Sequence, residues 1–71
     1  MKIKSSKVTL DGLYRVGDNV LTTYGECEIV AISYIINPAK NFEEEEVLSG
    51  NFYEKGMNML FLEKDIIKLN L

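Results

Sequence analysis

The side chains of this chain that could do chemistry are carboxylates, aromatic rings and one thiol. Histidine, the side chain used most often as a general base and metal ligand, is absent from the 71 residues, which removes the commonest catalytic and metal-binding arrangements. The candidates that remain suit binding, and they are Tyr24, Glu43, Glu44, Glu45, Glu46, Phe52 and Tyr53.

The single thiol belongs to Cys27, which lies between Glu26 and Glu28. A catalytic cysteine needs a nearby base and surroundings that stabilise the thiolate, and two flanking carboxylates oppose its ionisation. We therefore expect a packed cysteine and a protein that is not an enzyme. A lone cysteine forms no intrachain disulfide, which indicates a reducing, cytoplasmic location.

The acidic run, Glu43 to Glu46, places four like charges side by side. Mutual repulsion favours a solvated loop, and the same charges could instead steer a partner that has a basic surface. Calcium loops alternate their oxygen ligands around a glycine turn, and this run does not. We therefore expect no metal and no cofactor here.

The aromatic candidates flank predicted turns. Tyr24 precedes Gly25 at the tip of a predicted hairpin, and Phe52 and Tyr53 precede the turn Glu54–Gly56. If the two turns lie on one side of the fold, these rings could form a groove for a peptide or a cage for a cationic group. The alternative is that they are ordinary core or strand-surface aromatics.

Charge is distributed unevenly along the chain. Residues 1–24 have four basic and two acidic side chains, whereas residues 25–71 have four basic and nine acidic ones, which gives the net charge of −3. A negative domain repels phosphate backbones, so direct nucleic-acid binding is disfavoured. A local basic face built from Lys2, Lys4, Lys7, Arg15 and Lys68 stays open as an alternative.

The pattern of turns and β-prone segments predicts an all-β domain over residues 1–71. Turn signals occur at Asp11-Gly12, Gly17-Asp18, Gly25 and Gly56, where glycine supplies positive φ. Between them lie β-prone segments, which are 19–23, the long run 27–36, 47–53 interrupted by Ser49-Gly50, 57–62 and 66–71. Residues 2–10 are expected to form an edge strand or a tethered arm.

The long run 27–36 is apolar on both alternating faces, which favours a bent strand that changes partners in a small barrel. Pro38 ends it, and residues 39–46 are expected to form a loop or a single helical turn. A 3₁₀ turn is predicted over 63–65. In the last strand we expect Ile67, Leu69 and Leu71 to face inward.

Val16-Gly17-Asp18-Asn19-Val20, Tyr24-Gly25, Glu28–Ile32 and Leu62–Ile66 together resemble an SH3-like barrel of the KOW, Tudor and CarD type. The resemblance covers roughly residues 14–69. It implies a binding module, because CarD-like domains contact RNA polymerase, KOW domains contact ribosomal RNA or transcription factors, and Tudor domains bind methylated side chains. This chain departs from the KOW pattern because it is acidic.

We therefore expect a small stand-alone accessory or inhibitor protein that binds another protein through its acidic and aromatic residues. The Ile, Lys, Asn and Glu usage is typical of AT-rich bacteria and their phages. The alternative is a nucleic-acid or transcription-complex module. No run approaches the 18 apolar residues of a membrane span, and no apolar segment follows Met1–Lys7 as in a signal peptide. A homodimer through Ile35, Ile36 and Phe42 is a further hypothesis.

Overall fold

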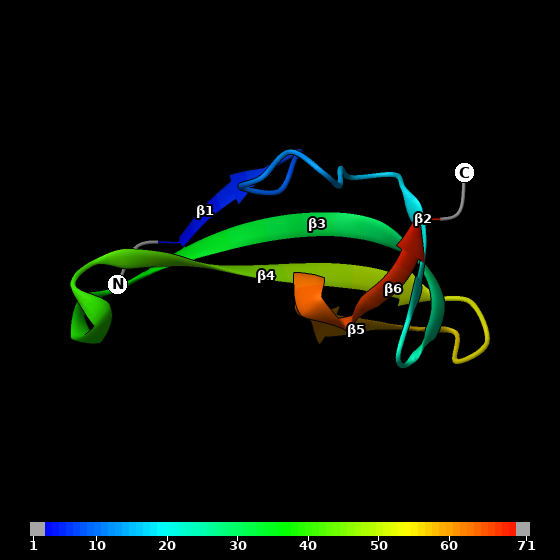
Figure 1. The fold of residues 1–71 in the computed structure, drawn as a ribbon. Coiled ribbons are helices and arrows are strands. Elements are labelled where there is room, and N and C mark those ends of the chain that lie inside the picture. Colours follow the sequence, from blue (N-terminus) through cyan, green and yellow to red (C-terminus); the bar gives the residue numbers. More distant parts are fainter. Residues whose placement is uncertain (1–2, 70–71) are drawn as a thin grey trace.

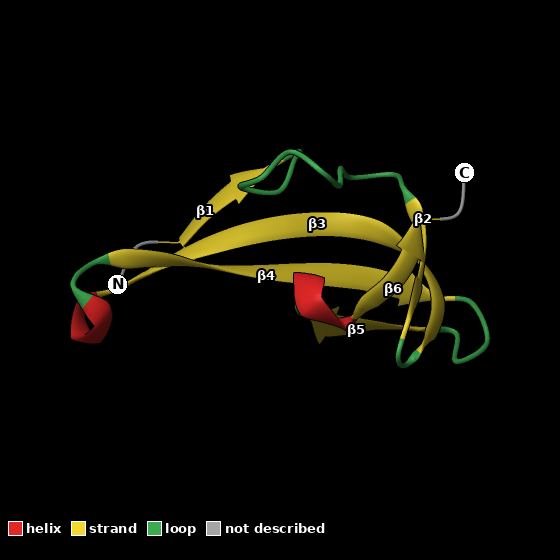
Figure 2. Cartoon of the chain, in the orientation of Figure 1, coloured by secondary structure: helices red, strands yellow, loops and turns green. Residues whose placement is uncertain are grey.

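The computed structural model describes residues 3–69, which form one curled antiparallel sheet of six strands (Figure 1). This confirms the predicted all-β class. Two short 3₁₀ helices, η1 and η2, complete the fold (Figure 2). In chain order, the elements are β1 (Ile3–Ser6), β2 (Asn19–Thr22), β3 (Gly25–Asn37), η1 (Pro38–Lys40), β4 (Glu43–Phe52), β5 (Met57–Phe61), η2 (Glu63–Asp65) and β6 (Ile66–Leu69).

The long strand β3 organises the sheet. Its first residues pair with β2, from Gly25 to Glu28, and its later residues pair with β1, from Ile32 to Ile35. On its other side β3 pairs with β4 along nearly its whole length. The predicted change of partner along this strand is confirmed. Figure 1 shows β1 lying beside the half of the β3–β4 hairpin that is nearer η1.

A β-bulge explains why both alternating faces of β3 are apolar. The register with β4 shifts between Ile29 and Ala31, so the alternation of inward and outward residues also shifts there. Cys27 and Ile29 are buried before the bulge, and Ile32 and Tyr34 are buried after it. Because of the bulge, β3 presents buried apolar side chains to the inner face of the curled sheet along both of its halves.

Among residues 3–69, the sheet runs in the order β5-β4-β3-β2-β6 and leaves β5 and β6 unpaired with each other. The result is a half-barrel, compatible with an SH3-like barrel. Its core comprises Val20, Cys27, Ile29, Ile32, Tyr34, Leu48, Phe52 and Phe61. Phe52 and Phe61 pack edge to face, with ring centroids 5.8 Å apart. No helix within the described residues is long and apolar enough to cross a membrane.

The acidic run is strand and not loop, which corrects the sequence expectation. Only Pro38–Lys40 forms the expected helical turn, where Asn37 accepts a hydrogen bond from the Ala39 N–H at 3.0 Å. Glu43 to Glu46 then pair with Asn37 to Tyr34 of β3. Successive strand residues point to opposite faces, so this pairing separates neighbouring carboxylates that would repel one another in a loop.

Two smaller expectations are also wrong. Ser49-Gly50 does not interrupt its strand, because both residues pair with β3 and β5. Ile67 is 64% exposed rather than inward, because the register between β2 and β6 shifts so that Ile66 and Leu69 pack against the core. Lys2 and Leu71, which the sequence placed in a basic face and an inward position, lie outside the described residues.

Candidate functional site

The open side of the half-barrel holds a pocket of about 330 Å³, which we call the seam pocket. Its walls come from the β2–β3 turn, β4, the end of β5 and η2. The lining residues are Tyr24, Val47, Leu60, Phe61, Leu62, Lys64 and Asp65. Binding sites are usually concave surfaces that combine apolar side chains with a few polar groups, and in this lining polar and apolar surface contribute almost equally.

Local hydrogen bonds hold Tyr24 at this position. The Thr22 hydroxyl donates to the Gly25 carbonyl at 2.9 Å and accepts from the Tyr24 N–H at 3.0 Å. Gly25 has a φ of 125°, a backbone conformation that residues with a side chain rarely adopt. The neighbouring Thr23 N–H donates to the Asp65 carbonyl at 3.0 Å, so the turn is attached to η2 next to the pairing of β2 with β6.

The pocket combines exposed apolar side chains with two charged ones. Leu60 is 71% exposed, Tyr24 46% and Leu62 40%, so these three present apolar surface to a partner. Asp65 accepts the Leu62 N–H at 3.0 Å, which gives its carboxylate a structural role at the start of η2.

The other two predicted aromatic residues are not in this pocket. Phe52 is 1% exposed and belongs to the core, so its ring is not available at the surface. Tyr53 is exposed, and its hydroxyl donates to the Asn19 side chain. Partial desolvation, followed by the negative charge of Glu28, raises the pKa of Tyr53. Phe52 is therefore buried away from the surface, and the two exposed rings, Tyr24 and Tyr53, have different neighbours.

The four acidic residues lie along the part of β4 that extends beyond its pairing with β5. Glu44 pairs with Lys4 of β1 at 3.7 Å, and Glu45 pairs with Lys40 of η1. The hydrogen bond between Lys40 and Glu45 raises the pKa of the lysine and lowers that of the glutamate. Glu43 is exposed, whereas Glu46 accepts a hydrogen bond from the Leu10 N–H at 2.6 Å.

Cys27 is fully buried in the core, and burial raises the pKa of its thiol. The side chain contributes to packing beside Gly50, where an added Cβ would lie 2.7 Å from its sulfur. Its position matches the sequence interpretation of a packed cysteine.

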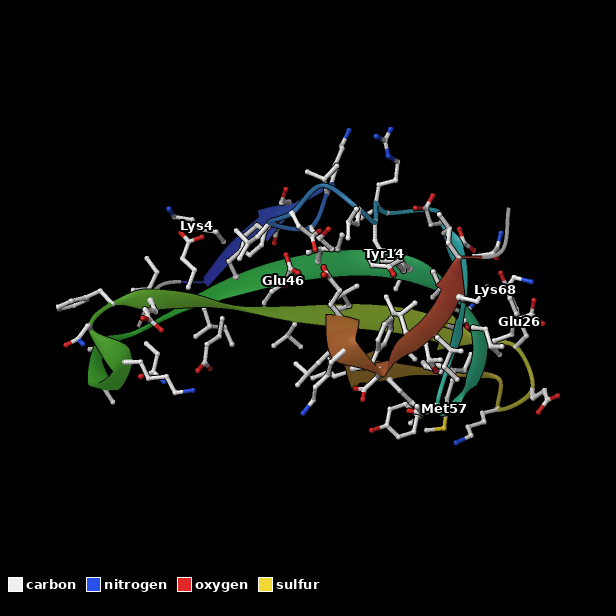
Figure 3. The ribbon with its side chains drawn as sticks, viewed as in Figure 1. Lys4, Tyr14, Glu26, Glu46, Met57 and Lys68 are labelled. Atoms are coloured by element: carbon white, nitrogen blue, oxygen red, sulfur yellow. The ribbon has the colours of Figure 1, made fainter. Side chains whose placement is uncertain are left out.

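The candidate basic residues are spread over the molecule. Lys4 of β1 and Lys68 of β6 lie far apart in Figure 3, and Lys4 is paired with Glu44. Lys7 and Arg15 lie closer together, because the residues Val8 and Arg15 form an isolated β-bridge. Among the candidate basic residues, Lys4 and Lys68 therefore lie apart, whereas Lys7 and Arg15 belong to the same loop.

Sequence reasoning missed the seam pocket and also a group of three carboxyl side chains, Asp11, Glu46 and Glu63. The hydrogen-bond contacts of Glu63 with Asp11 and Glu46 join three segments that are distant in sequence. In the sequence, Leu60, Leu62 and Lys64 indicate only a strand followed by a turn, and nothing marks them as residues of a binding site. No local sequence signal identifies contacts formed by folding over such separations.

Comparisons of this chain with protein-family models, with curated proteins and with solved structures found no match. The fold of the described residues is a small all-β half-barrel of six strands.

Proposed function

We propose that this chain is a non-catalytic protein-binding module that holds an apolar side chain of a partner in the seam pocket. The observation that carries the proposal is the pocket itself, in which exposed Tyr24, Leu60 and Leu62 surround a hollow at the open side of the half-barrel. Tyrosine rings that a partner covers at the centre of an interface are among the side chains that contribute most to binding energy.

The resemblance to SH3-like barrels of the KOW, Tudor and CarD type fits this proposal in outline. The half-barrel has the predicted strand entry at Asn19 and the predicted 3₁₀ turn before its last strand. Aromatic cages recognise cations through several ring faces, and here Tyr24 is the only exposed aromatic residue among those lining the pocket. A peptide segment with an apolar side chain is therefore a better ligand class for this pocket than a methylated lysine.

The part of the β3–β4 hairpin that contains Glu43 to Glu46, called the acidic hairpin, favours a partner with basic residues on its surface. Glu43 and Glu44 are exposed, and the pairing of Glu44 with Lys4 is a surface contact. Such charges guide encounter between partners more than they add affinity. The spread of Lys4 and Lys68 gives less support to the nucleic-acid alternative, because phosphate binding relies on clustered cations.

Affinity capture from the source cell with matched variants tests the proposal. Tyr24→Ser removes the exposed ring at the pocket, and Phe42→Ser removes an exposed ring at the far end of the β3–β4 hairpin. We expect one or more proteins to be retained by the wild type and by Phe42→Ser, and lost or reduced at least tenfold with Tyr24→Ser. Equal capture by both variants would contradict a role for the seam pocket.

A further inference from the structure

Three carboxyl side chains from separate segments meet on the inner side of the sheet. Asp11 belongs to the β1–β2 loop (residues 7–18), Glu46 to β4 and Glu63 to η2. Glu63 is in hydrogen-bond contact with both of the others. Figure 3 shows Glu46 on the side of the β3–β4 hairpin that faces the β1–β2 loop.

The hydrogen-bond donors at this cluster donate to Asp11 and Glu46 and not to Glu63. Asp11 Oδ1 accepts the Thr9 hydroxyl at 2.6 Å and the Leu13 N–H at 3.0 Å. Glu46 Oε2 accepts the Leu10 N–H at 2.6 Å. The two bonds to Asp11 favour the ionised form of its carboxyl group.

Glu63 has the opposite surroundings. Its Oε1 atom is shielded from solvent and has no hydrogen-bond donor among the described residues. Ionised carboxylates only accept hydrogen bonds, so a hydrogen bond between Glu63 and Asp11 forms only if a proton is present, and one proton makes one such bond. Because two donors already serve Asp11 as an anion, that proton belongs on Glu63.

The charges around Glu63 agree with this assignment. The groups that act on it electrostatically are Asp11 from the β1–β2 loop and Glu46 from β4, and both are acidic. Within η2, Lys64 is exposed and lines the seam pocket, and Asp65 accepts the Leu62 N–H. Across residues 3–69, no group of three or more acidic or cysteine side chains has an arrangement that could hold a metal ion.

The pKa directions follow from these contacts. Burial, followed by the hydrogen bonds and charges of Asp11 and Glu46, raises the pKa of Glu63 from 4.5 to about 7. The hydrogen bond with Glu63, followed by that from Thr9, lowers the pKa of Asp11 from 3.8 to about 2. Asp11 and Glu63 thus titrate as an interacting pair that shares one proton.

The middle of the β1–β2 loop is the part of this arrangement that could separate from the sheet, because few hydrogen bonds attach it there, whereas Gly17 and Asp18 at the end of the loop both bond to Ile29 of β3. Tyr34 donates its hydroxyl to the Val8 carbonyl, and the Leu10 N–H donates to Glu46. Beneath the loop, Thr9 is buried and Tyr14 packs against the core. Loosening the loop would uncover this part of the core.

We propose that Glu63 is a proton-dependent latch: its protonated carboxyl group donates to Asp11 and so holds the β1–β2 loop against the sheet beside Glu46, and loss of the proton leaves three carboxylates together and loosens the loop. A group with a raised pKa gives its full stabilisation below its unfolded value of 4.5, and this stabilisation is lost as pH rises through about 7. Asp11 acts in the opposite direction, and its contribution is lost as pH falls from 3.8 towards about 2. The loop is therefore held most firmly in mildly acidic solution.

Two NMR measurements on the full chain test the latch. The side-chain carboxyl carbon of Glu63 is expected to titrate with a midpoint near pH 7. Amide exchange of Leu10 and Leu13, whose N–H groups donate to Glu46 and Asp11, reports opening of the loop. The Gly56 N–H, which donates to the Phe52 carbonyl at 2.9 Å in the β4–β5 turn, is the internal control.

Between pH 5 and 7, exchange at Gly56 should rise about tenfold per pH unit through base catalysis alone. Exchange at Leu10 and Leu13 should rise by up to about a hundredfold per unit, because opening then also releases one proton. In Glu63→Gln the amide group supplies a donor that does not titrate, so the excess slope should disappear. Glu54→Gln, a change at an exposed glutamate in the β4–β5 turn, should keep it.

A Glu63 midpoint near 4.5 would overturn the proposal. So would equal slopes at Gly56 and at the two loop amides in the wild type, a measurement that needs no variant to fold. An excess slope that persists unchanged in Glu63→Gln would also overturn it, because a group other than Glu63 would then control the loop.

Discussion

Gly50 is the residue in the core with the least room for a side chain. An added Cβ would lie 2.7 Å from the Cys27 sulfur and 2.7 Å from Cε1 of Phe61. Both neighbours are buried, so neither can move without disturbing the packing of the core.

We expect Gly50→Ala to lower the free energy of unfolding by about 1–3 kcal/mol, the usual cost of overpacking a core. Urea unfolding followed by circular dichroism measures this change. Ser49→Ala, one residue earlier and on the other face of β4, is the control and should change stability much less. A Gly50→Ala protein as stable as the wild type would show that the core has more space than the structure gives it.

The sequence predicts the positive-φ glycines well and misjudges Gly50. Gly12, Gly17, Gly25 and Gly56 all have positive φ, because turn chemistry is local and visible in a dipeptide. The need for glycine at position 50 comes instead from Cys27 and Phe61, which approach it from other strands. That requirement has no local signature, so Ser49-Gly50 resembled a break in a strand.

At the scale of elements, the acidic hairpin is the part for which the sequence wrongly predicted a loop in place of a strand. Four consecutive glutamates favour a solvated loop when considered alone. In the folded chain, β3 supplies partners from Tyr34 to Asn37, and Lys4 and Lys40 pair with two of the carboxylates. Pairing with an already extended strand therefore overrides the local preference of the acidic residues.

The bent strand β3 shows the opposite case. Its length, its termination before Pro38 and its change of partner were predictable, because an apolar run on both faces is seldom compatible with a single exposed sheet. The bulge between Ile29 and Ala31 was not predictable, since it depends on the register with β4.

Replacing Glu43, Glu44 and Glu45 by glutamine should leave the folded state largely intact. Exposed ion pairs contribute about 0–1 kcal/mol, so the free energy of unfolding should change by less than about 1 kcal/mol for each pair. Association with a captured partner should become slower and less sensitive to salt. Stopped-flow or surface-based kinetics at two salt concentrations measures this, and an unchanged association rate would remove the acidic hairpin from the interface.

At the scale of the whole molecule, the carboxyl cluster predicts an unusual pH profile of stability. The raised pKa of Glu63 means that its stabilisation is complete below 4.5 and lost as pH rises through about 7. We therefore expect the free energy of unfolding to fall between pH 5 and pH 8 in the wild type. In Glu63→Gln the fall should be smaller, as measured by urea unfolding across this range.

The control for this profile is Glu54→Gln, which should reproduce the wild-type fall. A wild-type stability that is constant or rises from pH 5 to pH 8 would mean that Glu63 is ionised in the folded protein. The cluster was beyond prediction from sequence, because Asp11, Glu46 and Glu63 come together only when the β1–β2 loop, β4 and η2 have packed.

The most direct test of the binding proposal places a photo-crosslinking phenylalanine analogue at position 24 in one protein and at position 42 in another. Both native residues are exposed aromatics, with Tyr24 at the seam pocket and Phe42 at the far end of the β3–β4 hairpin. Irradiation in the source cell is expected to join a partner protein to position 24 and not to position 42. Absence of a cross-link at position 24, or an equal yield of the same product at position 42, would contradict the assignment of partner binding to the seam pocket.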